Sequence, residues 1–310
     1  MHLVNGMLLA AGRGERMEPL SSVIPKPALE VLGRPLLASA LAQLRGAGCE
    51  RVVVNLHRHP EMVAAAARDA GGELTASWEP ELLGGAGGLC AARPLLATGA
   101  VLVGNADVWS DLDLAPLLAA GDDGTAVLAL LPHPDPARWS SVVLDDGGRV
   151  QAFLPPGATY GGERYLFTGF QLIGAEVVAT LPAPPAEMAA VWQALLRRGA
   201  LRGVTVRGGW HEVGTPGAYR ELVTWLLGQG SWADPQATAS EGARVERSAI
   251  GAGCRVGADA DVRESLLTAG AAVEGGCRLQ RCVLAGPVTV SAASTFTDTL
   301  ILPQGRFPLR

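Results

Sequence analysis

The densest group of residues that could bind phosphate lies between Gly12 and Pro27, in the segment G-R-G-E-R-M-E-P-L-S-S-V-I-P-K-P. Gly12 and Gly14 follow an apolar run, so backbone N–H groups there can point at phosphate oxygens without obstruction by a Cβ atom. The Arg16 guanidinium can form paired hydrogen bonds with the β- and γ-phosphates of a nucleotide. Lys26 stands between two prolines that fix its backbone, and it can present a point charge to an α-phosphate. The segment therefore predicts a nucleotide-phosphate loop.

Two common phosphate-binding motifs do not describe this loop. The third glycine of a dinucleotide-binding fingerprint is missing, and no Gly-Lys-Ser/Thr ending of a Walker P-loop is present. The alternative interpretation is an ordinary glycine turn followed by a solvated, proline-rich loop.

The whole segment resembles the signature of the NDP-sugar pyrophosphorylase family, the sugar-1-phosphate nucleotidyltransferases. It matches G-x-G-x-R-[ML]-x-P-L-[ST]-x-x-x-P-K-P at every fixed position. The segment Leu83–Leu89 is similar to the family's base-binding loop L-G-T-A-G-A-L, with Gly85 in place of threonine. Glu79 stands where the family has a base-contacting Gln or Glu, and a carboxylate there would accept from uracil N3–H or guanine N1–H.

The resemblance extends over roughly residues 3–225. Asn105-Ala106-Asp107 is similar to the family's N-G-D motif, and Phe167–Phe170 to the segment that contacts the sugar. Trp210–Pro216 resembles W-x-D-x-G-T-P, with Glu212 where aspartate is usual. Within the family the chain is most similar to bacterial uridylyl- and guanylyltransferases that act on N-acetylmuramic acid, mannose or heptose 1-phosphates.

The resemblance implies a Mg²⁺-assisted reaction in which a sugar 1-phosphate attacks the α-phosphate of an NTP, with UTP or GTP favoured, and pyrophosphate leaves. Such a reaction depends on positioning and charge neutralisation more than on a protein nucleophile. The implied site residues are the following: catalytic Arg16, Lys26 and Asp107; nucleotide-binding Ala11, Gly12, Gly14, Arg16, Glu79 and Gly84; sugar-phosphate-binding Lys26, Thr168 and Gly169; metal-binding Asp107 and Glu212.

Several features leave alternatives open. Asp107 could cap a strand end, and Glu212 could lie in a solvated loop. Many relatives carry F-x-E-K-P on the sugar side, whereas Phe153 here is followed by Leu-Pro-Pro. One alternative is a catalytically silent regulatory subunit that binds nucleotides or NDP-sugars. Another is transfer to a non-sugar phosphate such as phosphocholine.

The elements that would position these residues alternate between strand and helix. Short apolar runs predict buried strands, and apolar stripes at helical spacing predict helices between them. The expected strands cover residues 7–11, 51–56, 74–78 and 101–103, and the expected helices cover residues 35–47, 61–70, 86–96 and 219–227. The order predicts an α/β domain with a Rossmann-like, mixed and mostly parallel sheet covered by helices on both faces. Ligands of such sheets lie at the carboxyl ends of the strands.

A repeat of seventeen residues occupies the C-terminal part. Its columns are Val245, Val262, Leu279 and Phe296; Ile250, Leu267, Leu284 and Ile301; Val256, Val273, Val290 and Phe307; and the small residues Ser248, Ser265, Cys282 and Thr299. Three apolar positions in each period predict a triangular coil whose stacking buries a continuous core. The pattern resembles the hexapeptide-repeat left-handed β-helix. Because no histidine follows His211, we expect an oligomerisation or regulatory module rather than an acyltransferase.

These patterns divide the 310 residues into a catalytic domain (1–227), a linker (228–240) and a β-helix with a short tail (241–310). The net charge of −5 without basic clusters argues against nucleic-acid or membrane partners. We interpret the apolar segment Met1–Ala11 as a buried strand rather than a signal peptide. Five cysteines without metal-ligand spacing suit a reducing cytoplasm, and the richness in Ala, Gly and Arg suggests a bacterial gene. We expect a homo-oligomer, with the β-helix as its candidate interface.

Overall fold

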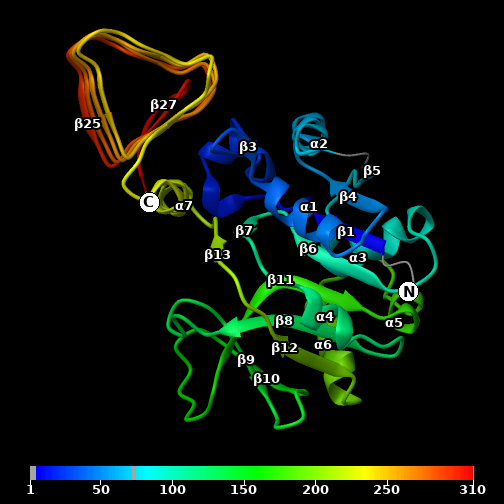
Figure 1. Ribbon diagram of the computed structural model, residues 1–310. Helices are drawn as coiled ribbons and strands as arrows, with labels where there is room; N and C mark the ends of the chain where they lie inside the picture. The colour runs from blue at the N-terminus through cyan, green and yellow to red at the C-terminus, as the bar shows by residue number, and fades with distance from the viewer. Residues whose placement is uncertain (1–4, 72–73, 310) are drawn as a thin grey trace. The chain divides into compact units, whose positions relative to one another are not determined.

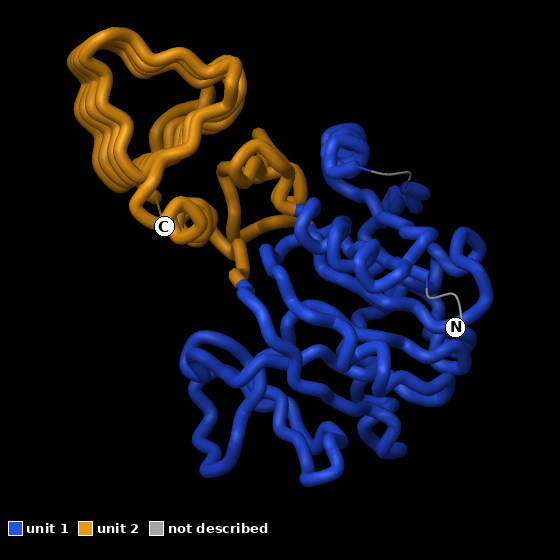
Figure 2. The backbone as a smooth tube through the Cα atoms, viewed as in Figure 1, with its two compact units in different colours: residues 1–12, 37–210 blue, residues 13–36, 211–310 orange. Residues whose placement is uncertain are grey.

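The computed structural model describes residues 5–71 and 74–309, which form two units (Figure 2). Unit 1 comprises residues 1–12 and 37–210, and unit 2 comprises residues 13–36 and 211–310. The start of the apolar segment Met1–Ala11 and the final residue of the expected tail lie outside the described residues. The phosphate-loop segment 13–36 groups with the C-terminal part, so the expected catalytic domain is divided between the units.

Unit 1 is built on a mixed, nine-stranded sheet with the order β10-β9-β11-β6-β1-β4-β5, to which β8 and β12 are joined through β11 (Figure 1). The strands are β1 (Asn5–Leu9), β4 (Val52–Leu56), β5 (Thr75–Trp78), β6 (Val101–Asn105), β8 (Ala126–Pro132), β9 (Ser141–Leu144), β10 (Val150–Leu154), β11 (Tyr165–Ile173) and β12 (Leu201–Thr205). The run β6-β1-β4-β5 is parallel, and β11 is antiparallel to β6 and β8. The short β7 (Val108–Ser110) follows β6.

Helices cover both faces of this sheet (Figure 1). They are α1 (Leu37–Gly46), α2 (Pro60–Asp69), α3 (Gly84–Ala92), α4 (Ala115–Ala119), α5 (Ala175–Ala179) and α6 (Met188–Arg197). Met7, Val53 and Val103 share one core cluster with Leu89 of α3 and Val191 of α6. Their strand neighbours point to the opposite face because side chains alternate along a strand, and those neighbours are buried too. The predicted strand–helix alternation is therefore confirmed.

Unit 2 begins with the loop segment 13–36, which contains three 3₁₀ turns and a small hairpin. The turns are η1 (Glu15–Met17), η2 (Leu20–Ser22) and η3 (Lys26–Ala28), and the hairpin strands are β2 (Glu30–Val31) and β3 (Arg34–Pro35). After β13 (Trp210–Glu212), α7 (Pro216–Leu227) begins at Thr215, whose side-chain oxygen accepts from the Ala218 N–H at 3.2 Å. This capping contact and Pro216 at the first helical position explain where α7 starts.

The rest of unit 2 is a parallel β-helix with a triangular outline (Figure 1). Its first sheet contains β14 (Trp232–Ala233), β17 (Ala249–Ile250), β20 (Leu266–Leu267), β23 (Val283–Leu284), β26 (Thr299–Leu302) and β27 (Gly305–Pro308). The second contains β15 (Thr238–Ala239), β18 (Arg255–Val256), β21 (Ala272–Val273) and β24 (Thr289–Val290), and the third β16 (Arg244–Glu246), β19 (Asp261–Arg263), β22 (Arg278–Gln280) and β25 (Thr295–Thr297).

The pairing register confirms the period of seventeen. Val262 pairs with Val245 and Leu279, and Leu267 pairs with Ile250 and Leu284. The small-residue column is stacked as well. The Ser248 hydroxyl accepts from the Ser265 N–H at 3.0 Å, and the Ser265 hydroxyl accepts from the next residue of its column at 2.9 Å.

Two details differ from the sequence-based expectation. Phe307 does not continue the column of Val290, because it lies in β27, which runs antiparallel to β26 and pairs Phe307 with Leu300. The expected linker 228–240 contains β14 and β15, which pair with the second coil. Strands of two residues are too short to show a pattern in a segment rich in Gly, Ser and Pro, so the start of the β-helix was not visible in the sequence.

One corner of the β-helix carries charged residues with positive φ. Arg247, Glu264, Arg281 and Asp298 follow one another at the repeat distance, with φ between 46° and 52°. Arg247 pairs with Glu264 at 2.7 Å, and Arg281 forms two hydrogen bonds of 2.6 Å with Asp298. Arg281 lowers the pKa of the Asp298 carboxyl. Charges of opposite sign thus alternate along a corner whose backbone conformation residues other than glycine rarely adopt.

Candidate nucleotide site

The first part of the predicted phosphate loop follows β1 directly. Ala11 is buried, and no atom outside the adjacent residues comes within 4 Å of a Cβ built on Gly12. Gly14 has φ +64°, and its carbonyl accepts from the Ser21 hydroxyl at 3.0 Å. The left-handed conformation explains why glycine stands at position 14.

Arg16 and Glu212, predicted to act on pyrophosphate and metal, form an ion pair within unit 2. The Arg16 guanidinium donates to Glu212 Oε1 at 2.6 Å. The Arg16 side chain is 67% exposed, whereas that of Glu212 is 16% exposed. A Cβ at Gly214 would lie 2.9 Å from an Arg16 nitrogen, so the glycine of the G-T-P motif leaves room for the guanidinium.

Lys26 lies in η3 and is 8% exposed, which is unusual for a lysine. The segment around it is anchored to α7, because the Tyr219 hydroxyl donates to the Glu30 carbonyl. Tyr219 is 1% exposed, and burial raises the pKa of its phenol. The buried, neutral Tyr219 hydroxyl thus anchors the segment that contains Lys26.

The predicted base loop is tied to the chain that precedes α6. The N–H groups of Ala86 and Gly87 both donate to the Ala186 carbonyl, at 3.0 and 2.9 Å. Gly84 has φ +75°, and a Cβ there would lie 2.5 Å from the same carbonyl oxygen. Glu79 is 1% exposed, and its Oε2 accepts from the Leu83 N–H at 3.1 Å.

Asp107 lies in the turn between β6 and β7. The N–H of Ala106 donates to the Leu9 carbonyl at 3.0 Å, which joins this turn to the end of β1. Ala106 is fully buried, so alanine is accommodated where relatives have glycine. A Cβ at Gly104 would lie 2.8 Å from the Phe170 ring, so the strand before Asp107 requires glycine there.

Thr168 and Gly169, predicted on the sugar-phosphate side, lie at an irregularity in β11. The Thr168 side chain is fully buried, and its hydroxyl donates to the Ala129 carbonyl at 2.9 Å. Gly169 has φ +92°, and a Cβ there would lie 3.2 Å from the Asn105 side chain. This segment therefore packs on the strand that leads to Asp107.

Aromatic side chains lie in unit 1 near the position of the missing Glu-Lys pair. Phe153 stacks on Trp192 with ring centroids 5.4 Å apart, and Phe167 meets the same ring edge-on at 5.1 Å. The Trp210 indole N–H donates to the Thr168 carbonyl at 2.9 Å. The structure thus has ring contacts on the side where many relatives have two charged residues.

The predicted residues fall into two groups. Ala11, Glu79 and Asp107 follow three strands of one parallel run in unit 1, and Arg16 and Glu212 are paired in unit 2. In residues 5–71 and 74–309 no three His, Cys, Asp or Glu side chains form a metal cluster. Mg²⁺ is usually held by one or two carboxylates together with phosphate oxygens and water. Asp107 and Glu212 each carry the hard carboxylate oxygen that Mg²⁺ prefers as a ligand.

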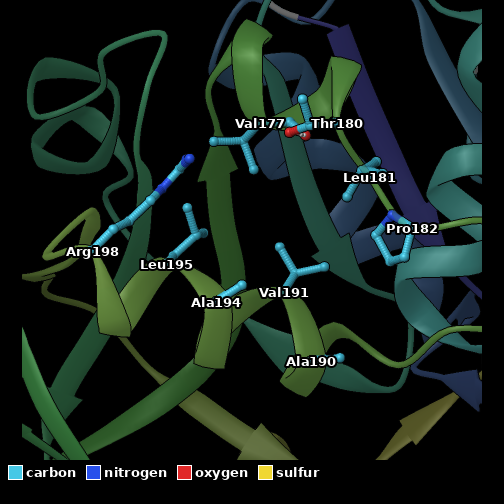
Figure 3. A pocket seen from close by; sticks show the side chains of 9 residues that line it. All are labelled: Val177, Thr180, Leu181, Pro182, Ala190, Val191, Ala194, Leu195 and Arg198. Atoms are coloured by element: carbon cyan, nitrogen blue, oxygen red, sulfur yellow. Dashed lines mark hydrogen bonds between the residues drawn. The ribbon is translucent and has the colours of Figure 1, made fainter.

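A separate pocket of about 300 Å³ lies in unit 1 between α5 and α6 (Figure 3). It is lined mainly by apolar side chains, including Val177, Val191 and Leu195, with Arg198 also at the wall. None of the predicted site residues lines it. We assign it no part in nucleotide binding.

Sequence reasoning missed two contributors to the site. Asn55 is the polar residue of the buried strand Val52–Leu56, and it is 3% exposed. A buried polar residue in an apolar strand is a signal that could have revealed it. Ala186 acts through its main chain, and no sequence pattern marks it.

Two family models match this chain. The family described as nucleotidyl transferase matches residues 5–227, and a GlmU-like, C-terminal hexapeptide family matches residues 235–298. The second match agrees with a left-handed β-helix. Among the described residues, the structure contains no helical segment with the length and hydrophobicity of a membrane span.

Curated relatives and solved structures are similar over most of the chain. An N-acetylmuramate alpha-1-phosphate uridylyltransferase of Neisseria meningitidis serogroup B is 31% identical, over 68% of this chain and 94% of the relative. A probable mannose-1-phosphate guanylyltransferase 1 of Oryza sativa subsp. japonica is 27% identical, over 96% of this chain and 86% of the relative. The structure of HddC from Yersinia pseudotuberculosis shares the fold, with a TM-score of 0.62 and 19% identity over 72% of this chain and all of that one. From the family match and the first relative, we conclude that this chain is a member of the nucleotidyl transferase family.

Proposed function

We propose that this chain is a Mg²⁺-dependent sugar-1-phosphate nucleotidyltransferase that makes an NDP-sugar and pyrophosphate, with UTP or GTP as its nucleotide. Family membership and the complete match of residues 12–27 support the reaction. Relatives whose names specify N-acetylmuramate and mannose 1-phosphates support a sugar phosphate as acceptor.

One observation carries this proposal. Three segments predicted to contact the nucleotide follow β1, β5 and β6, and hydrogen bonds join them at the carboxyl ends of the parallel strands. The Leu9 carbonyl accepts from Ala106, and the Ala10 N–H donates to Asn55, which in turn contacts Glu79. Open α/β sheets bind their ligands at this edge.

The proposed reaction is an in-line displacement at the α-phosphorus. A sugar-phosphate oxygen forms a bond to phosphorus while the bond to the bridging oxygen of pyrophosphate breaks. Backbone N–H groups of residues 11–14 and the Arg16 guanidinium would bind the phosphates that leave. Lys26 would bind the α-phosphate and the acceptor phosphate, Glu79 and Gly84 would lie at the base, and Thr168 and Gly169 would lie on the acceptor side.

Asp107 and Glu212 are the proposed metal ligands. When bound, Mg²⁺ would neutralise charge on the phosphates and help to orient them. Because Glu212 is paired with Arg16 at 2.6 Å, binding of a nucleotide with its metal would exchange this ion pair for contacts to phosphate and metal.

We further propose a cytoplasmic, bacterial protein that forms a homo-oligomer through its β-helix, without nucleic-acid or membrane partners. All five cysteines are free, as expected in a reducing compartment. The repeat module offers a regular surface for association between copies.

The deciding experiment measures pyrophosphate release with Mg²⁺, crossing the four NTPs with a panel of acceptors. The panel contains glucose, mannose, N-acetylglucosamine, N-acetylmuramic acid and heptose 1-phosphates, with phosphocholine as the non-sugar acceptor. Release should require one sugar phosphate with UTP or GTP. Asp107→Asn should lower turnover on the order of a hundredfold or more, because a metal ligand loses its charge, while the protein stays folded.

Two other outcomes would each point to an alternative. Release with phosphocholine alone would replace the sugar acceptor by a non-sugar phosphate. Nucleotide binding without release for any acceptor would indicate a silent regulatory subunit.

A further inference from the structure

Asn55 joins two segments that the proposed function assigns to the nucleotide. It lies in β4 and is 3% exposed. Its Oδ1 accepts from the Ala10 N–H at 2.7 Å, and its Nδ2 donates to Glu79 Oε1 at 2.8 Å. A backbone N–H can only donate, so Ala10 fixes the orientation of the amide and turns its N–H₂ group toward Glu79.

Glu79 depends on these contacts. Its carboxylate is 1% exposed, with Oε1 bonded to Asn55 and Oε2 to the Leu83 N–H. A buried carboxylate is costly unless donors surround it. A Cβ at Gly88 would lie 2.5 Å from Glu79 Oε1 and 2.9 Å from Asn55 Nδ2, so helix α3 packs closely against the pair.

We propose that Asn55 is a positioning residue for the nucleotide base, which acts by holding the Glu79 carboxylate and through it the loop 79–88. This inference rests on the proposed function, because it assumes that this loop receives the base. The pair also ties the loop to Ala10, at the entry to the phosphate segment. Base and phosphate contacts are thereby set by one buried hydrogen-bond chain.

The chemistry of the pair permits a reciprocal test. Asn55→Asp keeps an acceptor for Ala10 but places two carboxylates against each other. Glu79→Gln leaves a donor facing a donor, either at Asn55 or at Leu83. In the double variant the glutamine amide donates to the new aspartate, and its oxygen accepts from the Leu83 N–H. The double variant therefore restores the match of donors and acceptors.

Asn55→Asp should raise the KM for NTP about tenfold or more, because the mismatched buried pair no longer holds the loop 79–88 in place. Its kcat should change much less, because the phosphate and metal residues are untouched. Hydrogen exchange across residues 79–88 should accelerate in each single variant. The double variant should recover most of this protection and have a lower KM than either single variant.

Asn5→Asp is the matched control. Asn5 is 2% exposed and exchanges two hydrogen bonds of 2.9 Å with the main chain of Ala97, at the other end of β1. The Asn5→Asp variant should lose about as much stability as Asn55→Asp. Its KM for NTP should stay within about twofold of the wild-type value. If Asn55→Asp merely destabilises in the same way, or if the double variant recovers nothing, the inference is overturned.

The wild-type enzyme separates this failure from failure of the proposed function. Pyrophosphate release by the wild type, together with an unchanged KM in Asn55→Asp, would reject the inference alone. If the wild type releases no pyrophosphate, calorimetric titration with UTP and GTP decides the inference. A Kd weakened in Asn55→Asp but not in Asn5→Asp would support it, and equal affinities, or no binding at all, would reject it.

Discussion

At the scale of single residues, several charged side chains of the predicted site are paired with internal partners. Glu79 has internal donors for both carboxylate oxygens, and Arg16 and Glu212 neutralise each other. Glu30 differs, because burial and then the charge of Asp234 raise its carboxyl pKa above the ordinary value of 4.5, while a hydrogen bond from the Gly33 backbone opposes the shift. The ionised form of Glu30 is therefore disfavoured in the folded protein.

Glu30→Gln tests this shift. The folded state binds the Glu30 proton more tightly than the unfolded state, so the stabilisation is present below pH 4.5 and is lost as the pH rises through the higher folded value. The free energy of unfolding of the variant, relative to wild type, should increase over that pH range. Urea unfolding at several pH values measures it, with the exposed Glu241→Gln as control. A difference independent of pH would contradict the assignment.

At the scale of elements, α3 shows how packing distinguishes glycines within one helix. A Cβ at Gly85 would make only ordinary contacts, the nearest at 3.6 Å to Met188. At Gly88 the same atom would collide with Glu79 and Asn55. The resembled loop L-G-T-A-G-A-L has threonine and alanine at these two positions, so the contrast comes from the contacts that Glu79 and Asn55 make in this chain.

Gly85→Ala and Gly88→Ala form a matched pair of variants. Gly85→Ala should stabilise the protein by about 0.5–1 kcal/mol, because alanine loses less backbone entropy in a helix. Gly88→Ala should destabilise it by about 1–3 kcal/mol and raise the NTP KM, because the Asn55–Glu79 pair must shift. Thermal unfolding and steady-state kinetics measure both. Equal effects of the two substitutions on stability and on the KM for NTP would show that α3 does not pack closely against Asn55 and Glu79.

Much of this organisation could be predicted from the sequence, and the misses have physical reasons. Apolar runs showed β1, β4 and β6, and the period of seventeen showed the β-helix register, because burial repeats along the chain. Ala186 could not be found, because its contacts use a main-chain carbonyl. Phe307 fits a column of the repeat because it is apolar at the right distance, but the turn after β26 reverses the strand.

At the scale of the whole unit, the β-helix supports the phosphate-loop segment 13–36. A Cβ at Gly33 would lie 2.8 Å from the Trp232 ring, and Gln304 donates to the Ser22 hydroxyl at 3.2 Å. Val23 lies against Gly286. These contacts between the segment and the coils indicate that the β-helix contributes to the placement of Arg16 and Lys26.

Trp232→Ala tests this support. Loss of the ring should lower the free energy of unfolding by about 2 kcal/mol, less than for a fully buried tryptophan. It should also raise the NTP KM, because the segment that carries Arg16 and Lys26 loses its contact at Gly33. Chemical unfolding measures the change in stability, and steady-state kinetics measure the change in KM. Trp225→Ala is the control, because Trp225 is 56% exposed. An unchanged KM in a destabilised variant would limit Trp232 to a role in stability.

The contacts of segment 13–36 also restrict how the coil number can change during evolution. The segment contacts Trp232 near the first coil, and its Glu30 side chain lies near Gly251 on the second coil. It also contacts Gly286, which follows β23, and Gln304, which follows β26. Deleting seventeen residues would keep every column in register, yet would bring the far contacts nearer by one strand spacing, about 4.8 Å. The repeat alone tolerates insertions and deletions of whole coils. Segment 13–36 contacts several coils at fixed distances along the stack. The number of coils between Trp232 and Gln304 can therefore change only if the length of segment 13–36 changes as well.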